Sequence, residues 1–94
     1  MRIQEIEIYA DTTNAAIMRH PGRRFPGVLI QGDTLSSLYR QAERACAAAK
    51  GKVTDDEYDE IDELREHLLG YLIHYKNVLG EHRMELPFHG SIGS

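Results

Sequence analysis

The chain has very little cysteine and no long apolar segment. Its single cysteine, Cys46, cannot form an internal disulfide, and a lone thiol is typical of proteins in reducing compartments. No apolar run is long enough to span a bilayer, and the N-terminus lacks the apolar core of a secretory signal peptide. Together these absences predict a cytoplasmic protein without a membrane anchor.

Basic residues are in the minority. The 94 residues include 11 Lys or Arg and 15 Asp or Glu, a net charge of -4. This balance argues against a general affinity for nucleic acid or anionic membrane, because both need a dominant positive field. Residues 1–53 carry eight basic and five acidic side chains, whereas residues 54–94 carry three and ten. Such a split suits self-association or contact between the halves, but also an ordinary protein whose helix is acidic.

What is present is a composition of ordinary globular type, with 41% hydrophobic and 28% charged residues. Alternation of apolar and polar residues over 4–10 predicts a first strand, with Ile6, Ile8 and Ala10 on one face. A polar turn and a short apolar run predict a second strand over 15–20. A β-branched apolar run between two glycines predicts a third strand over 28–31.

The second half of the chain has the pattern of helices. Asp33 is positioned to cap a helix over 34–49, and Thr54 with Glu57 forms a capping box that begins a longer helix over about 55–79. The predicted inward stripe of the first helix is Leu35, Leu38, Ala42, Ala45, Cys46 and Ala49. The predicted stripe of the second helix is Tyr58, Ile61, Leu64, Leu68, Tyr71, Leu72, Tyr75, Val78 and Leu79. Pro87 excludes any continuation of that helix.

The sequence therefore predicts an α+β fold, a three-stranded antiparallel sheet followed by a two-helix hairpin that covers one face of the sheet. We expect a single domain over residues 1–88 and a flexible tail over 89–94. Leu69 and Ile73 lie at or beyond the edge of the apolar stripe, and one face of the sheet is partly apolar. This apolar surplus predicts a homodimer.

The stretch RHPGRRFPG, residues 19–27, concentrates positive charge between two Pro-Gly pairs. The side chains of Arg19, His20, Arg23 and Arg24 suit a phosphate or carboxylate, because guanidinium groups form bidentate hydrogen bonds and prolines reduce the entropy lost on ordering the loop. They also suit a protein partner, with Phe25 as its anchor. The alternative is a rigid hairpin loop whose arginines are solvated or pair with Glu5, Glu7 or the acidic helix, with Phe25 in the core.

Residues 55–66 contain eight carboxylates. Those in the first helical turn are explained by the helix dipole. The others include Asp59, Glu60, Asp62 and Glu63, which form either a solvated face or a docking strip for a basic partner. Their order does not match a calcium loop.

No metal site or cofactor is expected. Only Glu63 and His67 are close enough along the helix to share a metal ion, and exposed helical histidines account for the pattern better than a metal site does. Cys46 lies among alanines on the inward stripe and is expected to be a small buried residue. With no nucleophile elbow and no phosphate loop, the sequence favours binding over catalysis.

Residues 11–35 resemble a family of small uncharacterised bacterial proteins. The resemblance lies in a turn, an Arg-x-Pro-Gly-Arg-x-Phe-Pro-Gly segment and a Gln-Gly-Asp helix start. It implies a bacterial cytoplasmic protein and no particular activity. Two hypotheses follow. The first is a non-catalytic protein-interaction module, such as an immunity, antitoxin-like or adaptor protein. The second is a small anion-binding or enzymatic module that uses the arginine-rich loop.

Overall fold

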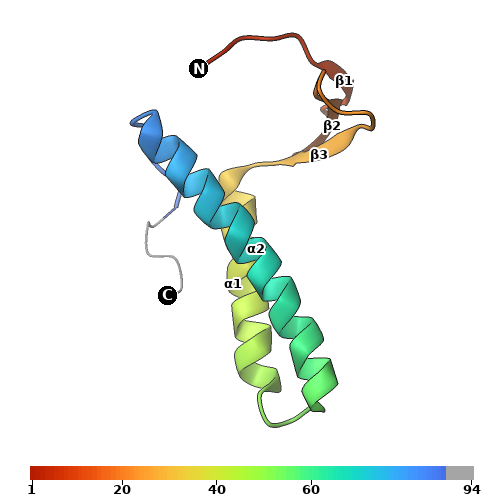
Figure 1. Ribbon diagram of the computed structural model, residues 1–94, viewed down its shortest axis with the longest axis vertical. Coiled ribbons are helices and arrows are strands. Elements are labelled where there is room, and N and C mark those ends of the chain that lie inside the picture. Colours follow the sequence, from red (N-terminus) through yellow and green to blue (C-terminus); the bar gives the residue numbers. More distant parts are fainter. Residues whose placement is uncertain (89–94) are drawn as a thin grey trace. The chain divides into compact units, whose positions relative to one another are not determined.

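The structure is a computed structural model that describes residues 1–88 (Figure 1). Three antiparallel strands are followed by two helices, which confirms the predicted α+β fold and its element order. The chain divides into two compact units, Met1–Gln31 and Gly32–Ser94, and each is described by itself. The predicted packing of hairpin on sheet therefore stays a prediction, and the predicted tail, 89–94, lies outside the described residues.

The first unit is a meander of β1 (Glu7–Ala10), β2 (Ala15–Arg19) and β3 (Gly27–Ile30), with β2 in the centre. β1 begins at Glu7, later than predicted, because its partner β2 ends at Arg19 and offers no pairing to earlier residues. The turn before β2 is closed by Thr13. Its hydroxyl accepts a hydrogen bond from the Ala15 amide at 3.3 Å, as short polar side chains do in turns.

The pairing register changes within β1. Ile8 lies opposite Met18, whereas Ala10 lies opposite Ile17, so Tyr9 is an extra residue in a bulge. Residues directly opposite share a face of the sheet, and neighbours along a strand face opposite sides. Ile8 and Ala10 therefore lie on different faces. The prediction that they share one is wrong, because a bulge cannot be recognised from alternation in a single strand.

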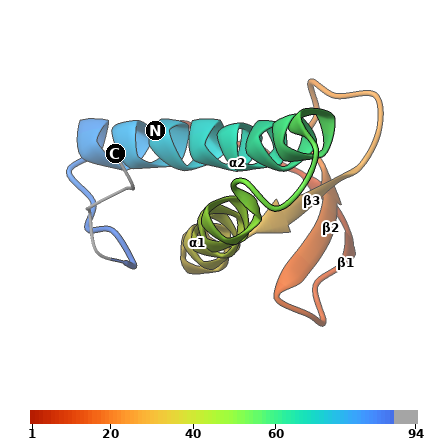
Figure 2. The same cartoon turned by 90° about the horizontal axis from the view of Figure 1, so that it is seen from below.

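The second unit is a hairpin of α1 (Gly32–Ala49) and α2 (Asp55–Glu81), which run in opposite directions and cross (Figures 1 and 2). Gly51, at φ 75°, supplies the left-handed residue in the turn between them. The predicted capping box is confirmed. The Glu57 amide donates to the Thr54 hydroxyl at 3.1 Å, and the Thr54 amide donates to the Glu57 carboxylate at 2.9 Å.

The start of α1 differs from the prediction, whereas the end of α2 at Glu81 agrees with the expected end at about residue 79. α1 begins at Gly32, so Asp33 lies within its first turn, where its carboxylate accepts from the Thr34 amide at 2.8 Å. α2 ends through a Schellman motif in which the Met84 amide donates to the Leu79 carbonyl at 2.9 Å and Arg83 is left-handed at φ 56°. Backbone geometry thus ends α2 well before Pro87.

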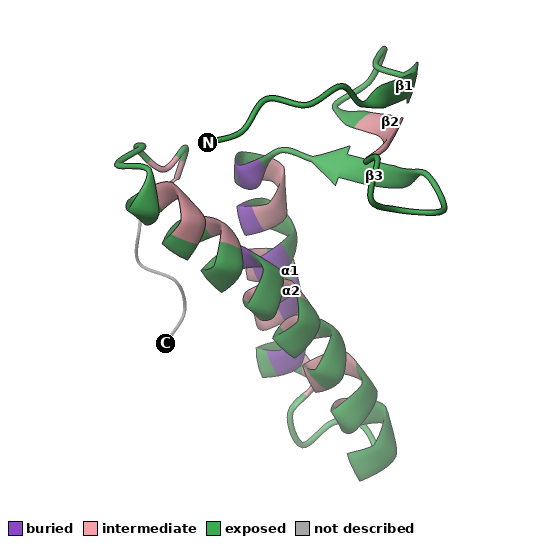
Figure 3. Ribbon diagram, turned by 45° about the horizontal axis from the view of Figure 1, so that its top comes forward, coloured by how far each residue is buried: buried purple, intermediate pink, exposed green. Residues whose placement is uncertain are grey.

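Among residues 1–88, the buried residues all lie in the hairpin (Figure 3). They are Gly32, Ser36, Tyr39, Ala42 and Cys46 in α1 and Leu72 in α2. The predicted stripes are partly wrong, since Leu38 and Ala45 on α1 and Leu64 and Tyr71 on α2 are exposed. Tyr39 and the half-buried Arg65 occupy inward positions instead.

The physical reason for this rotation is that long side chains with polar ends fill part of the core. Tyr39 is buried, and its hydroxyl donates to the Glu43 carboxylate at 3.1 Å. Burial, and then the hydrogen bond with Glu43, raise the pKa of Tyr39. A stripe built only from apolar residues does not include such side chains.

Candidate functional site

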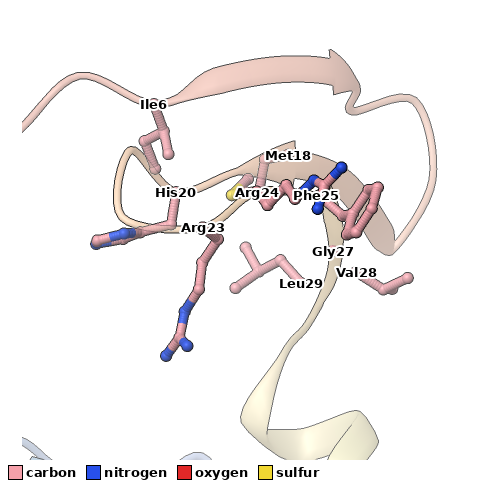
Figure 4. A pocket seen from close by; sticks show the side chains of 9 residues that line it. All are labelled: Ile6, Met18, His20, Arg23, Arg24, Phe25, Gly27, Val28 and Leu29. Carbon is pink, nitrogen blue, oxygen red and sulfur yellow. The ribbon is translucent and has the colours of Figure 1, made fainter.

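One face of the sheet carries an open, largely apolar groove of about 670 Å³ (Figure 4). Its floor includes Ile6, Met18 and Leu29. Met18 and Leu29 share a face of the sheet, because Met18 lies opposite Gly27 and Leu29 lies two residues beyond Gly27 on the same strand. The floor therefore combines side chains from the start of the chain, from β2 and from β3.

The rim of the groove comes from the loop between β2 and β3 and includes His20, Arg23 and Arg24. The first Pro-Gly pair forms the predicted turn, closed by the Arg23 amide, which donates to the His20 carbonyl at 2.9 Å. The Gly22 amide also donates to His20 Nδ1 at 3.0 Å, which fixes the imidazole against the turn. The rim is thus ordered by local hydrogen bonds before any ligand is present.

Arg19 has a different role from the other basic residues of the loop. It lies next to Met18 on β2 and opposite Glu7, so its side chain is on the face away from the groove. Its guanidinium pairs with Glu7 and donates to the Arg23 carbonyl at 2.9 Å. The hydrogen bond from Arg19 holds the pKa of Glu7 below its ordinary value. Arg19 therefore braces the loop, as the structural alternative predicts for this residue.

The guanidinium groups of Arg23 and Arg24 differ from that of Arg19 in their contacts. Among residues 1–88, no carboxylate forms an ion pair with Arg23 or Arg24. The Arg24 guanidinium carbon lies 5.2 Å from the centre of the Phe25 ring, a cation–π distance. Figure 4 shows these two side chains beside each other, with Arg23 and His20 extending from the other part of the loop. Phe25 is 71% exposed, so the alternative that it is a core residue is wrong.

The predicted acidic strip lies on α2, in the other unit. Asp59, Glu60 and Glu63 are exposed. Asp62 is half-buried and accepts two hydrogen bonds from Arg65, at 3.0 and 2.9 Å. The hydrogen bonds to its carboxylate partners raise the pKa of Arg65. Asp62 thus pairs with Arg65 along α2, and the other three carboxylates of the strip are available to solvent.

Sequence reasoning identified the rim of the groove and missed its floor. His20, Arg23, Arg24 and Phe25 lie together at the groove as predicted candidates, because they are neighbours in sequence. The apolar floor residues were not singled out as site residues. Strand alternation could have indicated which of the floor residues share a face of the sheet. It could not have shown which of the two faces lies beside the loop between β2 and β3.

Other chemistry is sparse in the part of the chain that the structure describes. Within residues 1–88, no group of three or more His, Cys, Asp or Glu side chains is placed to hold a metal ion. No helix of that range combines the length and apolar character needed to cross a membrane. Cys46 is buried, as predicted.

Comparison with known proteins gives one match. A protein-family model matches residues 1–88, which include the strands, the arginine-rich loop and both helices. No curated protein and no solved structure matches the chain. The chain thus belongs, over residues 1–88, to the family of unknown function DUF6959.

Proposed function

We propose that this protein is a non-catalytic interaction module that binds an acidic, partly apolar segment of a partner protein in the groove of the sheet. The observation that carries this proposal is the arrangement of Arg23 and Arg24, whose guanidinium groups have no carboxylate partner within residues 1–88, beside an apolar floor. Immunity, antitoxin-like and adaptor proteins of the bacterial cytoplasm are the proposed biological roles.

The two parts of the groove suit different parts of such a segment. Guanidinium groups bind carboxylates through paired, charge-assisted hydrogen bonds. The apolar floor suits aliphatic or aromatic side chains, and the exposed ring of Phe25 supplies a rigid aromatic anchor of the kind enriched at protein interfaces. Because the loop is already held by the turn and by Arg19, little entropy is lost when a partner binds.

The competing anion-binding or enzymatic reading is less well supported. A small anion would contact the basic rim and leave the apolar floor unused. The groove lining contains no carboxylate, hydroxyl, thiol or amine side chain. His20 is the one imidazole among the lining residues, and the lining places no nucleophile beside it. This composition favours recognition over chemistry.

The test uses a fluorescein-labelled peptide that alternates Glu with Leu and Phe, and a matched peptide with Lys in place of Glu. Fluorescence anisotropy should show binding of the acidic peptide and not of the basic one, with affinity that falls as salt rises. The double variant Arg23→Glu/Arg24→Glu should bind at least tenfold more weakly, with an unchanged melting temperature.

The matched control is Lys50→Glu/Lys52→Glu, which makes the same change in net charge at exposed positions between the helices. This variant should retain the wild-type affinity. An equal loss in both double variants would show that the peptide responds to net charge alone and would refute the groove as the site. Competition by millimolar inorganic phosphate at constant ionic strength would favour the anion-binding reading instead.

A further inference from the structure

The helical hairpin has an apolar face that its own two helices do not bury. Four exposed apolar residues contribute to it: Leu38, Ala45, Leu64 and Tyr71. Leu64 is 56% exposed and Tyr71 is 66% exposed. Each of the four immediately precedes an inward-facing residue, namely Tyr39, Cys46, Arg65 and Leu72.

Helix geometry places these four side chains on the same side of the hairpin. One step back along a helix is a rotation of about 100° from the inward direction. Both helices are right-handed and run in opposite directions (Figures 1 and 2), so this step leads to the same face of the hairpin from either helix. Ile73, which follows Leu72, lies on the opposite face by the same reasoning.

The face is large enough to support a specific dimer. α2 has 27 residues and α1 has 18, which correspond to lengths of about 40 and 27 Å. With helices about 10 Å apart, the face covers roughly 600 Å² per copy, or roughly 1,200 Å² in a symmetric pair. That total is at the lower limit of stable protein interfaces.

The charge along α2 determines how two such faces can meet. Residues 55–66 contain eight carboxylates and one arginine, whereas residues 67–81 contain one carboxylate, Lys76 and two histidines. A parallel pair of α2 helices would place the two acidic halves together, at an electrostatic cost. An antiparallel pair places each acidic half against the nearly neutral half of the second copy.

We propose that a second copy of this chain packs on this face, with the two α2 helices antiparallel and crossing near Leu68, the midpoint of the helix. Leu64 of one copy then meets Tyr71 of the other, and the contact repeats by two-fold symmetry. This surface lies on α1 and α2 alone, so the proposal is independent of the groove and of what binds there. It differs from the sequence-based dimer prediction, which relied on Leu69 and Ile73.

The first test is the mass of the full chain in solution, measured by light scattering across a concentration series. The wild type should have the mass of two chains at micromolar concentration. The variant Leu64→Gln/Tyr71→Gln should dissociate at least tenfold more readily, with an unchanged helical circular dichroism spectrum. Ile73→Gln, a similar loss of apolar surface on the opposite face, should remain dimeric.

The second test is the orientation of α2, measured by disulfide cross-linking of single variants. The variant His67→Cys carries its cysteine near the proposed crossing and should cross-link to the same position of the second copy. Glu60→Cys should not cross-link. A chain that keeps the mass of one copy at high micromolar concentration would overturn the proposal. Ile73→Gln that dissociates as readily as the double variant would also overturn the proposal. Efficient cross-linking through Glu60→Cys would do the same.

Discussion

The two units of the chain are stabilised in different ways. Every buried residue of the described chain lies in the hairpin, whereas the sheet unit has no buried residue, and only residues 16–19 on the central strand are partly buried. The strands are held by their backbone ladder, by turn hydrogen bonds and by the brace from Arg19. A small sheet of this kind needs a covered apolar face for independent stability.

This difference separates the protein into a part that supplies stability and a part whose apolar side chains line an open groove. Apolar side chains such as Met18 and Leu29 line the groove instead of filling a core. Such surface contributes little to folding until it is covered. The same substitution made once in each unit is therefore expected to have unequal effects, and three such pairs test the comparison.

The largest difference is expected between Leu72→Ala and Leu29→Ala. Leu72 is 1% exposed, so its truncation should cost about 2 to 5 kcal/mol through lost burial and a residual cavity. Leu29 is 52% exposed, and its truncation should cost about 1 kcal/mol or less. Urea unfolding of both variants measures the two values. Equal losses would show that the sheet carries a core of its own.

A second pair is Gly32→Ala and Gly27→Ala. A Cβ at residue 32 would overlap the ring of Tyr75, which stacks on Phe88 at a centroid distance of 6.2 Å. Moving that ring should cost about 1 to 3 kcal/mol. A Cβ at Gly27 would meet no atom within 4 Å, so the second variant should be nearly neutral. Adding Tyr75→Leu to Gly32→Ala should recover part of the loss, as a thermal melt can show.

A third pair is Thr54→Ala and Thr13→Ala. Loss of the Thr54 hydroxyl removes an N-cap from α2 and should lower the unfolding free energy by about 1 kcal/mol. Thr13 makes hydrogen bonds only within an exposed turn, so its loss should cost a few tenths of a kcal/mol. Chemical denaturation measures the unfolding free energy of both variants. A larger loss for Thr13→Ala than for Thr54→Ala would contradict the comparison.

The smallest effects are expected from pH. Hydrogen bonds from the Thr54 amide and hydroxyl lower the pKa of Glu57, and Arg19 lowers that of Glu7, from an ordinary value of 4.5. Both carboxylates therefore stabilise the fold above pH 4.5, and this contribution is lost as the pH falls through their lowered pKa values.

Melting temperatures of Glu57→Gln and Glu7→Gln should be slightly below that of the wild type at pH 7. Each gap should close as the pH falls below the lowered pKa of that carboxyl, because the wild-type side chain is then also neutral. A gap that widens in acid would contradict the assigned direction of the pKa shift.

The order and type of the elements could be predicted because their signals are local. The Thr54 and Glu57 capping box marks the start of α2 within four residues of sequence, and the Pro-Gly turn at Pro21 is equally local. The rim of the groove was predictable for the same reason, since His20, Arg23, Arg24 and Phe25 are contiguous in the loop or nearly so.

What could not be predicted depends on pairing between segments. The bulge in β1 is defined only by the register against β2, and it moves Ile8 and Ala10 to different faces. The rotation of the helix stripes places Tyr39 and Arg65 on the inward side, although each bonds to a carboxylate of its own helix. Which side of each helix is inward is set only by the packing of α1 against α2. The groove floor likewise requires knowledge of which residue lies across the sheet.

The groove also has a consequence for how quickly the protein reaches its functional form. All of its lining residues lie between Ile6 and Leu29, and each strand pairs with the next one along the chain. The helices likewise pack against their immediate neighbour in sequence. Such a chain has a low contact order, and proteins of this kind fold on the microsecond to millisecond timescale because few distant segments must find one another.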